Sequence, residues 1–508
     1  MKKHELVLVL DFGGQYKELI ARSTREALVY SEISPGTISI ERIKELNPIG
    51  IILTGGPNSV YLDNAPKLAP EIFDLGIPIL GICYGMQLIC HMLGGSVQTL
   101  DKGEYGQVLV KQTGAESKIL PKSAEFKSLM SHRDSVQAPP SGFHITAQTK
   151  NCIAAIENHE KNIFAVQFHP ESNHTDYGKE IFENFLYNIC NASKDYLIDG
   201  YINEQIETIQ ATVGKNRVLL ALSGGVDSSV LAALLSKALP GQITCIFVDH
   251  GFMRLNEGDE IEAAFSSKEL EFIRINAIDR FLGKLKGITD PEQKRKIIGH
   301  EFIAVFEEEA KKLDNIEFFA QGTIYPDIVE SGGEFGAVIK SHHNVGGLPE
   351  KLNFSKIIEP LSRLFKDEVR QMGMKLGLPH NIVFRAPFPG PGLSIRIMGE
   401  ITKEKLELLR QADYITRCEL MCLENVPSQF FAVLTNTYSV GVKGDERTYD
   451  PVLAIRAVDT KDFMTANFSH IPYDILTKIS SRITSEVAGI SRVVYDITAK
   501  PPGTVEWE

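Results

Sequence analysis

The hydrophobic positions near the start of the chain fall into short apolar runs that end in glycine-containing turns. Three such runs are Leu6–Leu10, Ile49–Leu53 and Ile77–Leu80. Near-continuous apolar strands that alternate with glycine turns and helices are typical of a parallel α/β sheet. Loops at the carboxyl ends of such strands are the usual site of chemistry, so we expect reactive residues there.

The same pattern returns in the middle of the chain. Val218–Leu222 predicts a buried strand, and the apolar residues from Val230 to Ala238 recur at helical spacing. Pro240-Gly241 ends this helix, and Ile243–Val248 predicts the next strand. These segments predict a βαβ unit and a second parallel α/β domain.

A different pattern follows the Pro/Gly-rich stretch Arg385–Leu393, whose composition excludes helix and favours a stiff connector. Beyond it, alternating residues predict strands and helical spacing predicts helices, namely strands Phe430–Leu434, Val452–Val458 and Arg492–Ile497 and helices Glu404–Gln411 and Tyr473–Val487. This is a small α+β domain. With a junction near Ser193–Gly200, the predicted domains are 5–195, 196–385 and 386–508.

The composition of the chain disfavours several classes of function. The 508 residues are more than one core normally organises, and the net charge of −12 disfavours a nucleic-acid binder, which needs a basic surface. Seven scattered cysteines do not form a disulfide pattern. A signal-peptide core and an apolar run long enough to span a membrane are both lacking, so we expect a cytoplasmic protein without membrane or nucleic-acid partners.

The turn between the predicted strand at Val218 and its helix is rich in glycine and serine. It comprises Ser223, Gly224, Gly225, Val226, Asp227, Ser228 and Ser229. Backbone N–H groups and a helix N-terminus converge at such a turn, glycines let an anion approach, and serine hydroxyls add donors. We therefore predict a phosphate site. It is not a Walker-type loop, because the Gly-Lys-Ser/Thr ending is missing.

This loop resembles the pyrophosphate loop of the ATP pyrophosphatases. The resemblance implies that ATP activates a carbonyl oxygen as an adenylate and that pyrophosphate leaves. Asp227 and Asp327 are carboxylates near the expected phosphates, so Mg²⁺ bridging is a reasonable role, above all for Asp227. For Asp327 a helix-cap or turn role is an equal alternative.

The first domain carries a nucleophile signature, Gly81-x-Cys83-x-Gly85. Small flanking residues allow a sharp strand-to-helix turn that exposes the thiol, and the helix N-terminus lowers thiol pKa values. His169 and Glu171 follow an apolar strand and, two residues apart, face the same side. They supply the base and the orienting carboxylate that a thiol nucleophile needs. The cysteines at 90, 152, 190 and 245 are expected to be buried and structural.

Residues 5 to about 190 resemble the class I glutamine amidotransferases through these motifs. The resemblance implies that Cys83 attacks the glutamine side-chain amide, with His169 as acid and base and Glu171 as its support. It further implies oxyanion or glutamine contacts from the Gly56 and Tyr84 backbone and from Gln87. The segment Ser131-His132-Arg133-Asp134 departs from the family pattern at Arg133 and receives no role.

The whole chain resembles the GMP synthetase family, through segments 339–349, 385–393, 438–445 and 500–508. The resemblance implies glutamine-dependent, ATP-driven amination of xanthosine monophosphate (XMP) to GMP by a homodimer. It places Lys340 at the ATP phosphates and assigns XMP contacts to Arg295, Gln429, Lys500 and Glu506. Without the resemblance, Arg295 would be assigned to a solvated helix face, and the tail to a subunit interface.

Three alternatives remain open at this point. One is another amidotransferase-linked ATP pyrophosphatase with a different acceptor. Another is a tRNA-thiolating enzyme, which needs a reactive Cys near the loop and a basic face, whereas Cys245 lies in a predicted strand. The third is a nucleotide sensor, which has no use for a thiol nucleophile.

Overall fold

The computed structural model describes residues 4–63, 65–266, 269–313, 315–330, 354, 356–386, 388–460 and 465–508. The chain divides into two compact units, Met1–Tyr201 and Ile202–Glu508, and each is described by itself. The bounds of the three predicted domains stay a prediction. In the described part of the chain, no helix combines the length and the apolar character needed to cross a bilayer.

The first unit is built on one mixed sheet with the strand order β2-β1-β3-β4-β9-β8-β7-β5-β6. Its first five strands in that order pair in parallel, and the remaining pairings are antiparallel. The strands are β1 (Leu6–Asp11), β2 (Tyr30–Pro35), β3 (Gly50–Leu53), β4 (Ile79–Ile82), β5 (Ser96–Gln112), β6 (Glu125–Ala138), β7 (His144–Gln148), β8 (Ile153–Asn158) and β9 (Ile163–Val166).

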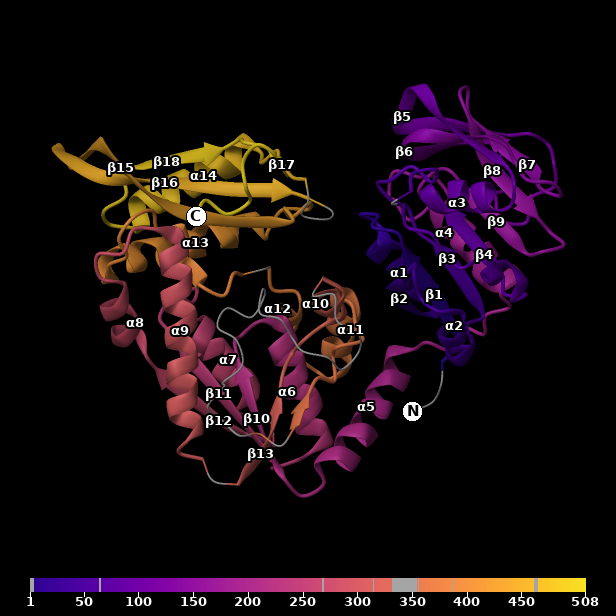
Figure 1. The fold of residues 1–508 in the computed structure, drawn as a ribbon. Coiled ribbons are helices and arrows are strands. Elements are labelled where there is room, and N and C mark those ends of the chain that lie inside the picture. Colours follow the sequence, from indigo (N-terminus) through magenta and orange to yellow (C-terminus); the bar gives the residue numbers. More distant parts are fainter. Residues whose placement is uncertain are drawn as a thin grey trace. The chain divides into compact units, whose positions relative to one another are not determined.

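Helices cover the parallel half of this sheet (Figure 1). They are α1 (Lys17–Glu26), α2 (Ile40–Leu46), η1 (Pro70–Asp74), α3 (Tyr84–Met92), α4 (Gly178–Glu183) and the π-helical turn η2 (Asn184–Ile189). The apolar runs predicted as strands are β1, β3 and β4, and their side chains form one core with α3. The antiparallel strands β5 to β7 were not predicted, since β5 is mostly exposed and lacks a clear apolar face.

The second unit contains a parallel sheet with the order β12-β11-β10-β13-β14, as the βαβ pattern predicts. Its strands are β10 (Arg217–Leu222), β11 (Ile243–Asp249), β12 (Glu271–Asn276), β13 (Ile316–Ala320) and β14 (Lys356–Ile358). The helices around it are α5 (Ile198–Val213), α6 (Val226–Ala238), α7 (Glu257–Phe265), α8 (Ile278–Leu285), α9 (Pro291–Ala310), α10 (Tyr325–Glu330), α11 (Lys366–Lys375) and α12 (His380–Val383).

The C-terminal part of the second unit is an α+β layer, drawn in orange to yellow in Figure 1. It comprises η3 (Gly392–Arg396), α13 (Lys403–Leu420), β15 (Gln429–Lys443), β16 (Glu446–Asp459), β17 (Asn467–Phe468), α14 (Tyr473–Glu486) and β18 (Arg492–Asp496). The predicted fold class, two parallel-sheet α/β domains and then a small α+β domain, is confirmed. The prediction of no helix over 385–393 is wrong at its last two residues, where the short 3-10 turn η3 begins.

One buried cluster joins the parallel sheet to the α+β layer. It runs from Leu219 in β10 through Phe252 and Leu406 to Phe430 in β15. Helix α9 contacts both β11 and η3 and so links the two layers. Because core packing is close, this shared interior makes Ile202–Glu508 a single compact unit.

Candidate functional site

Cys83 lies in a sharp turn between β4 and α3. Its backbone has φ 54° and ψ −104°, a sparsely populated conformation for a non-glycine residue, which the surrounding structure must hold. The Cys83 N–H donates to the Val166 carbonyl at 2.8 Å. A Cβ at Gly81 would lie 2.8 Å from the Gly85 carbonyl, and one at Gly85 would lie 2.5 Å from the Leu53 carbonyl oxygen. Both glycines are therefore required by the close approach of α3 to the strands.

His169 and Glu171 follow β9, the strand beside β4. Their Nδ1 and Oε1 atoms are 2.7 Å apart, and both side chains are buried. Burial lowers the pKa of His169, but the Glu171 carboxylate and a hydrogen-bonded Cys83 raise it, and the net pKa is well above its usual value. The structure thus brings the predicted thiol, imidazole and carboxylate together.

Three further groups line this site that the sequence patterns did not indicate. The Tyr16 ring meets the His169 ring edge-on, with centroids 5.0 Å apart. The Gln167 amide lies 3.6 Å from the Cys83 sulfur. A Cβ at Gly55 would be 3.3 Å from the His169 ring and 3.8 Å from the Cys83 Cβ, so only glycine leaves that space open. Tyr16 gave no local signal, whereas Gln167 stands in the same strand-end motif as His169.

The predicted oxyanion and glutamine residues surround the same turn. A Cβ at Gly56 would approach the Phe12 carbonyl oxygen to 2.8 Å, so its backbone lies tight against the neighbouring turn. Tyr84 begins α3, and its hydroxyl donates to the Pro66 carbonyl at 2.7 Å. The buried Gln87 donates from Nε2 to the Asp134 carbonyl at 2.7 Å. Gln87 is therefore locked to β6.

The predicted phosphate loop joins β10 to α6. Gly225 caps the helix, and Gly224 has a φ of 80°, which favours glycine. Ser223 Oγ accepts from the Gly225 N–H at 3.3 Å and lies 3.1 Å from Ser228 Oγ. Val226, Asp227, Ser228 and Ser229 form the first turn of α6. The free N–H groups of a helix start are thus held at the carboxyl end of β10.

Asp227 is ion-paired to a lysine that the sequence patterns missed. Lys366 Nζ lies 2.9 and 2.7 Å from its two carboxylate oxygens, although the two residues are 139 apart in sequence. Asp327 Oδ2 accepts from the Ile324 N–H at 3.0 Å, as in the helix-cap alternative. Lys340 lies outside the described residues.

Two of the four predicted XMP residues, Lys500 and Glu506, belong to the C-terminal tail, and Gln429 and Arg295 bond to it. Glu506 accepts from the buried Arg396 at 2.7 and 3.0 Å and from Gln429 at 3.1 Å. Arg295 on α9 donates to the Glu508 carbonyl at 2.5 Å. Lys500, the fourth, pairs through its backbone with Ala466. The tail is docked, as its Pro-Pro and Trp content predicts.

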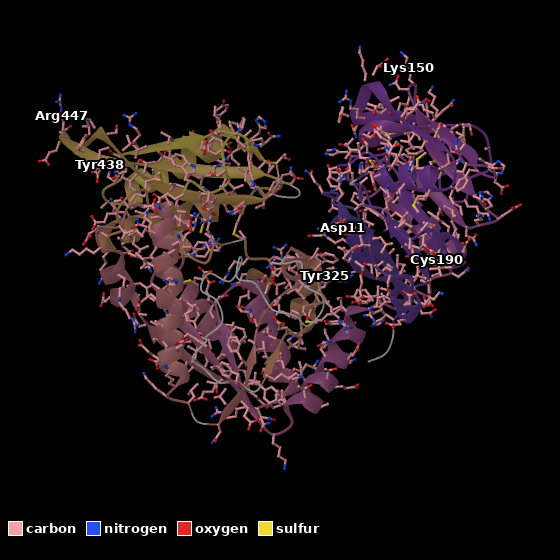
Figure 2. All side chains as sticks on the ribbon, in the orientation of Figure 1. Asp11, Lys150, Cys190, Tyr325, Tyr438 and Arg447 are labelled. Carbon is pink, nitrogen blue, oxygen red and sulfur yellow. The ribbon has the colours of Figure 1, made fainter. Side chains whose placement is uncertain are left out.

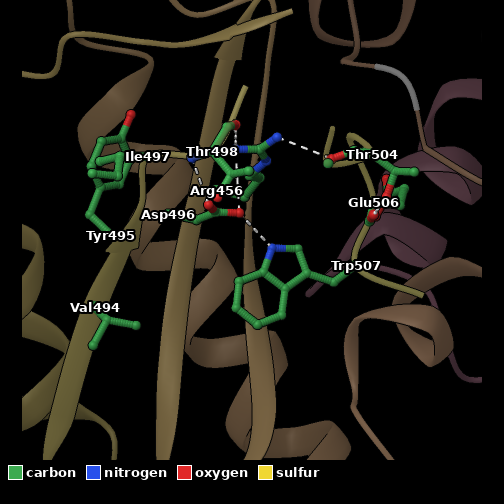
Figure 3. Close-up of a pocket in the computed structure, with 10 residues that line it drawn as sticks. Arg456, Val494, Tyr495, Asp496, Ile497, Thr498, Thr504, Glu506 and Trp507 are labelled. Carbon is green, nitrogen blue, oxygen red and sulfur yellow. Dashed lines mark hydrogen bonds and ion pairs between the residues drawn. The ribbon is translucent and has the colours of Figure 1, made fainter. Parts of the chain in front are cut away.

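A pocket of about 520 Å³ opens beside the tail (Figure 3). Trp507 donates from its indole to Asp496 at 2.9 Å, and Arg456 donates to the carbonyls of Thr498 and Thr504 at 2.6 and 3.0 Å. Of the four predicted XMP residues, Glu506 alone is among the described residues that line it. Arg295, Gln429 and Lys500 do not line this pocket.

Comparisons with known proteins match three family models. Residues 8–189 match glutamine amidotransferase class-I, residues 199–278 the PP-loop domain, and residues 419–507 the GMP synthase C terminal domain. This chain is 58% identical to a Finegoldia magna protein named "GMP synthase [glutamine-hydrolyzing]", and the match covers 100% of both chains. It is also 58% identical to a Treponema denticola protein of the same name, over 100% of this chain and 98% of that protein.

The fold and both sites define a class I glutamine amidotransferase joined to an ATP-utilising PP-loop domain. The similarity to these relatives over the full length of the chain then decides which acceptor the enzyme uses. The chain belongs to the glutamine-hydrolysing GMP synthase family.

We expect Glu171→Gln to move the alkaline limb of the glutamine-hydrolysis pH profile to lower pH. Glu171 raises the pKa of His169, so without its charge the imidazolium loses its proton earlier as pH rises. The measurement is kcat/KM against pH. Tyr16→Phe is the matched control, because it keeps a ring against His169 and changes no charge; its limb should stay in place. An unshifted limb in Glu171→Gln would show that Glu171 does not set this pKa.

Proposed function

We propose that the two sites of this chain catalyse two different steps of the family's reaction, glutamine hydrolysis and XMP amination. The enzyme is a ligase of purine nucleotide biosynthesis: it aminates XMP to GMP with ATP, takes the nitrogen from glutamine, and releases AMP, pyrophosphate and glutamate. The observation that carries the division is that one chain holds both the buried Cys83–His169–Glu171 arrangement and the β10–α6 phosphate loop.

In the proposed glutaminase step, the Cys83 sulfur attacks the amide carbon of the glutamine side chain as its thiol proton passes to His169. The carbon–nitrogen bond breaks as His169 gives its proton to the departing ammonia, which leaves a glutamyl thioester. His169 then takes a proton from water, which attacks the thioester and frees glutamate. The backbone N–H groups of Tyr84 and Gly56 would stabilise the oxyanion, Glu171 holds the imidazole, and Gln87 supports the substrate pocket.

In the proposed synthetase step, the phosphate loop from Ser223 to Ser229 binds ATP through its backbone N–H groups and hydroxyls, with Lys340 as a further phosphate contact. The C2 oxygen of XMP attacks the α-phosphate, pyrophosphate leaves, and ammonia then displaces AMP from the adenyl-XMP intermediate. Asp227, whose carboxylate pairs with Lys366 in this structure, would exchange that cation for Mg²⁺, since carboxylate oxygens suit this hard cation. When bound, the ion offsets the negative charge of the leaving pyrophosphate.

We further propose that Arg295, Gln429, Lys500 and Glu506 contact XMP and that two chains form a homodimer. A strongly exposed row of apolar side chains on the β15–β16 hairpin supports the dimer: Val440 is 57%, Val442 71% and Tyr449 70% exposed. Figure 2 shows Tyr438 and Arg447 toward the free end of this hairpin. Exposed apolar patches of this kind mark association surfaces.

A cytoplasmic location also belongs to this proposal. All seven cysteines are free thiols, as a reducing compartment requires. Cell fractionation followed by detection of the chain checks the location, and recovery outside the cytoplasmic fraction would contradict it.

Cys83→Ala should abolish GMP formation from glutamine, by roughly 10³-fold or more, because the thioester cannot form. Synthesis from high ammonium should be spared, since ammonia then needs no glutaminase. GMP formation with each nitrogen source is the measurement, and Cys422→Ser, an exposed thiol in the second unit, is the control. Equal loss of both activities with the fold intact would argue against two separate sites.

Asp227→Asn should slow pyrophosphate release from ATP and XMP by about 10²-fold and shift its Mg²⁺ dependence to higher concentration, because a charged oxygen ligand is lost. The matched control is Asp327→Asn, which keeps an oxygen acceptor for the Ile324 N–H and should show a much smaller effect. A near-normal rate in Asp227→Asn would remove this carboxylate from the mechanism.

Lys500→Gln should raise the KM for XMP about tenfold by removing one charged phosphate contact. Pyrophosphate release is titrated with XMP at several protein concentrations, and sedimentation reports the oligomer in parallel. Lys478→Gln, which removes a lysine of α14 paired with Glu419 of α13, is the control. If XMP affinity recovers fully once the oligomer is held together by concentration, Lys500 serves assembly and its substrate assignment is wrong.

A further inference from the structure

A cluster of potential metal ligands lies in the antiparallel part of the first unit, outside the glutaminase residues. Glu104 on β5, His132 on β6 and Cys152 in the β7–β8 turn each point one ligand atom at the others, all within 4.8 Å. Glu104 and His132 are direct partners in the β5–β6 register, so their side chains share one face of the sheet. Their side chains are only 3% and 2% exposed.

The distances within the cluster match a tetrahedral metal site. Glu104 Oε2 lies 3.4 Å from His132 Nε2 and 3.2 Å from the Cys152 sulfur, and that sulfur is 3.9 Å from His132 Nε2. Tetrahedral zinc with bonds of about 2.0–2.3 Å separates its ligand atoms by about 3.3–3.6 Å. Shifts of a few tenths of an ångström would therefore place all three atoms on one ion.

The surrounding groups orient the three ligands as a metal site requires. His132 Nδ1 lies 2.9 Å from the Asp134 carbonyl, and this contact turns the ring so that Nε2 faces Glu104 Oε2. The other oxygen of Glu104 accepts from Thr149 at 2.8 Å and from Asn151 at 2.9 Å, which holds Oε2 toward the cluster.

We propose that Glu104, His132 and Cys152 bind one borderline-soft divalent cation of the Zn²⁺ type, with water as the fourth ligand. Thiolate and imidazole donors select such an ion over Mg²⁺ or Ca²⁺. Cys152 is only partly buried, and Lys150, two residues before it, lies at the outer edge of the unit in Figure 2, so the cluster is accessible to solvent ions. On binding, the thiol proton is released to the buffer and a metal–sulfur bond forms.

The site would fasten three segments that are far apart in sequence. It ties the β5–β6 hairpin to the β7–β8 turn, and β6 also reaches the glutaminase residues. The Ser131 carbonyl, next to His132, lies 3.9 Å from the Cys83 sulfur, and the Asp134 carbonyl holds Gln87. The bound ion therefore has a structural role beside the nucleophile rather than a role in bond making.

The test uses the full-length chain with Cys83→Ala, Cys418→Ser and Cys422→Ser, which removes the nucleophile and the thiols at 418 and 422. The remaining cysteines at 90, 190 and 245 are buried, so a metal–thiolate signal can come only from Cys152. The reduced, chelator-treated protein is titrated with Co²⁺ in visible and near-ultraviolet light and, separately, loaded with Zn²⁺ for elemental analysis. We expect tetrahedral Co²⁺ bands, a thiolate charge-transfer band and one Zn²⁺ per chain.

Adding Cys152→Ser should remove the charge-transfer band, and His132→Gln should remove the bound Zn²⁺. Asn151→Ala, which loosens Glu104 but keeps all three ligand residues, should weaken binding about 10–100-fold. Circular dichroism of each metal-free variant shows that the fold is retained. A charge-transfer band that survives Cys152→Ser, or a parent chain that binds neither Co²⁺ nor Zn²⁺, would overturn the proposal.

Discussion

The pairing of β4 with β9 is the constraint on which the first unit depends. Gly81 pairs with Ala165 and Ile82 with Val166, and the Cys83 N–H continues the ladder to the Val166 carbonyl at 2.8 Å. This register brings two strand ends, more than 80 residues apart in sequence, to one edge. A slip of one residue would turn every following side chain to the other face, and His169 would leave the thiol. The β4–β9 register therefore places all three groups together: the proposed nucleophile, its imidazole and the carboxylate.

At the C-terminus, two buried cations hold the tail in the fold. Arg396 and Lys294 are fully buried cations, and their partners are the tail carboxylates of Glu506 and Glu508. Leaving a buried charge without its partner costs about 3–5 kcal/mol, so the tail is part of the fold rather than a loose end. The same pairs anchor the predicted XMP residues, because Gln429 and Arg295 bond to this tail. The proposed XMP contacts and the stability of the second unit therefore depend on the same residues.

Strand β6 connects the two proposals about the first unit. Its backbone meets the Cys83 sulfur through Ser131 and holds Gln87 through Asp134, while the His132 side chain joins the Glu104–Cys152 cluster. Register shifts in β5 next to Glu104 bend the ladder there, and such irregularities re-aim side chains near functional sites. A ligand on the cluster would therefore stiffen the strand that supports the nucleophile.

The site residues that the sequence predicted are those that lie in short motifs of neighbouring residues. A strand followed by Gly-x-Cys-x-Gly, a His-Pro-Glu strand end and a Ser-Gly-Gly loop each carry their chemistry within about seven residues, because turns and helix starts are set by neighbouring side chains. Tyr16, Lys366, Arg396 and the Glu104–His132–Cys152 cluster carried no such signal. Each reaches its partner across tens to more than a hundred residues, so strand order, register and burial decide the contact. Strand β5 was missed for the related reason that it is mostly exposed, so its pairing depends on neighbours in the sheet rather than on an apolar pattern of its own.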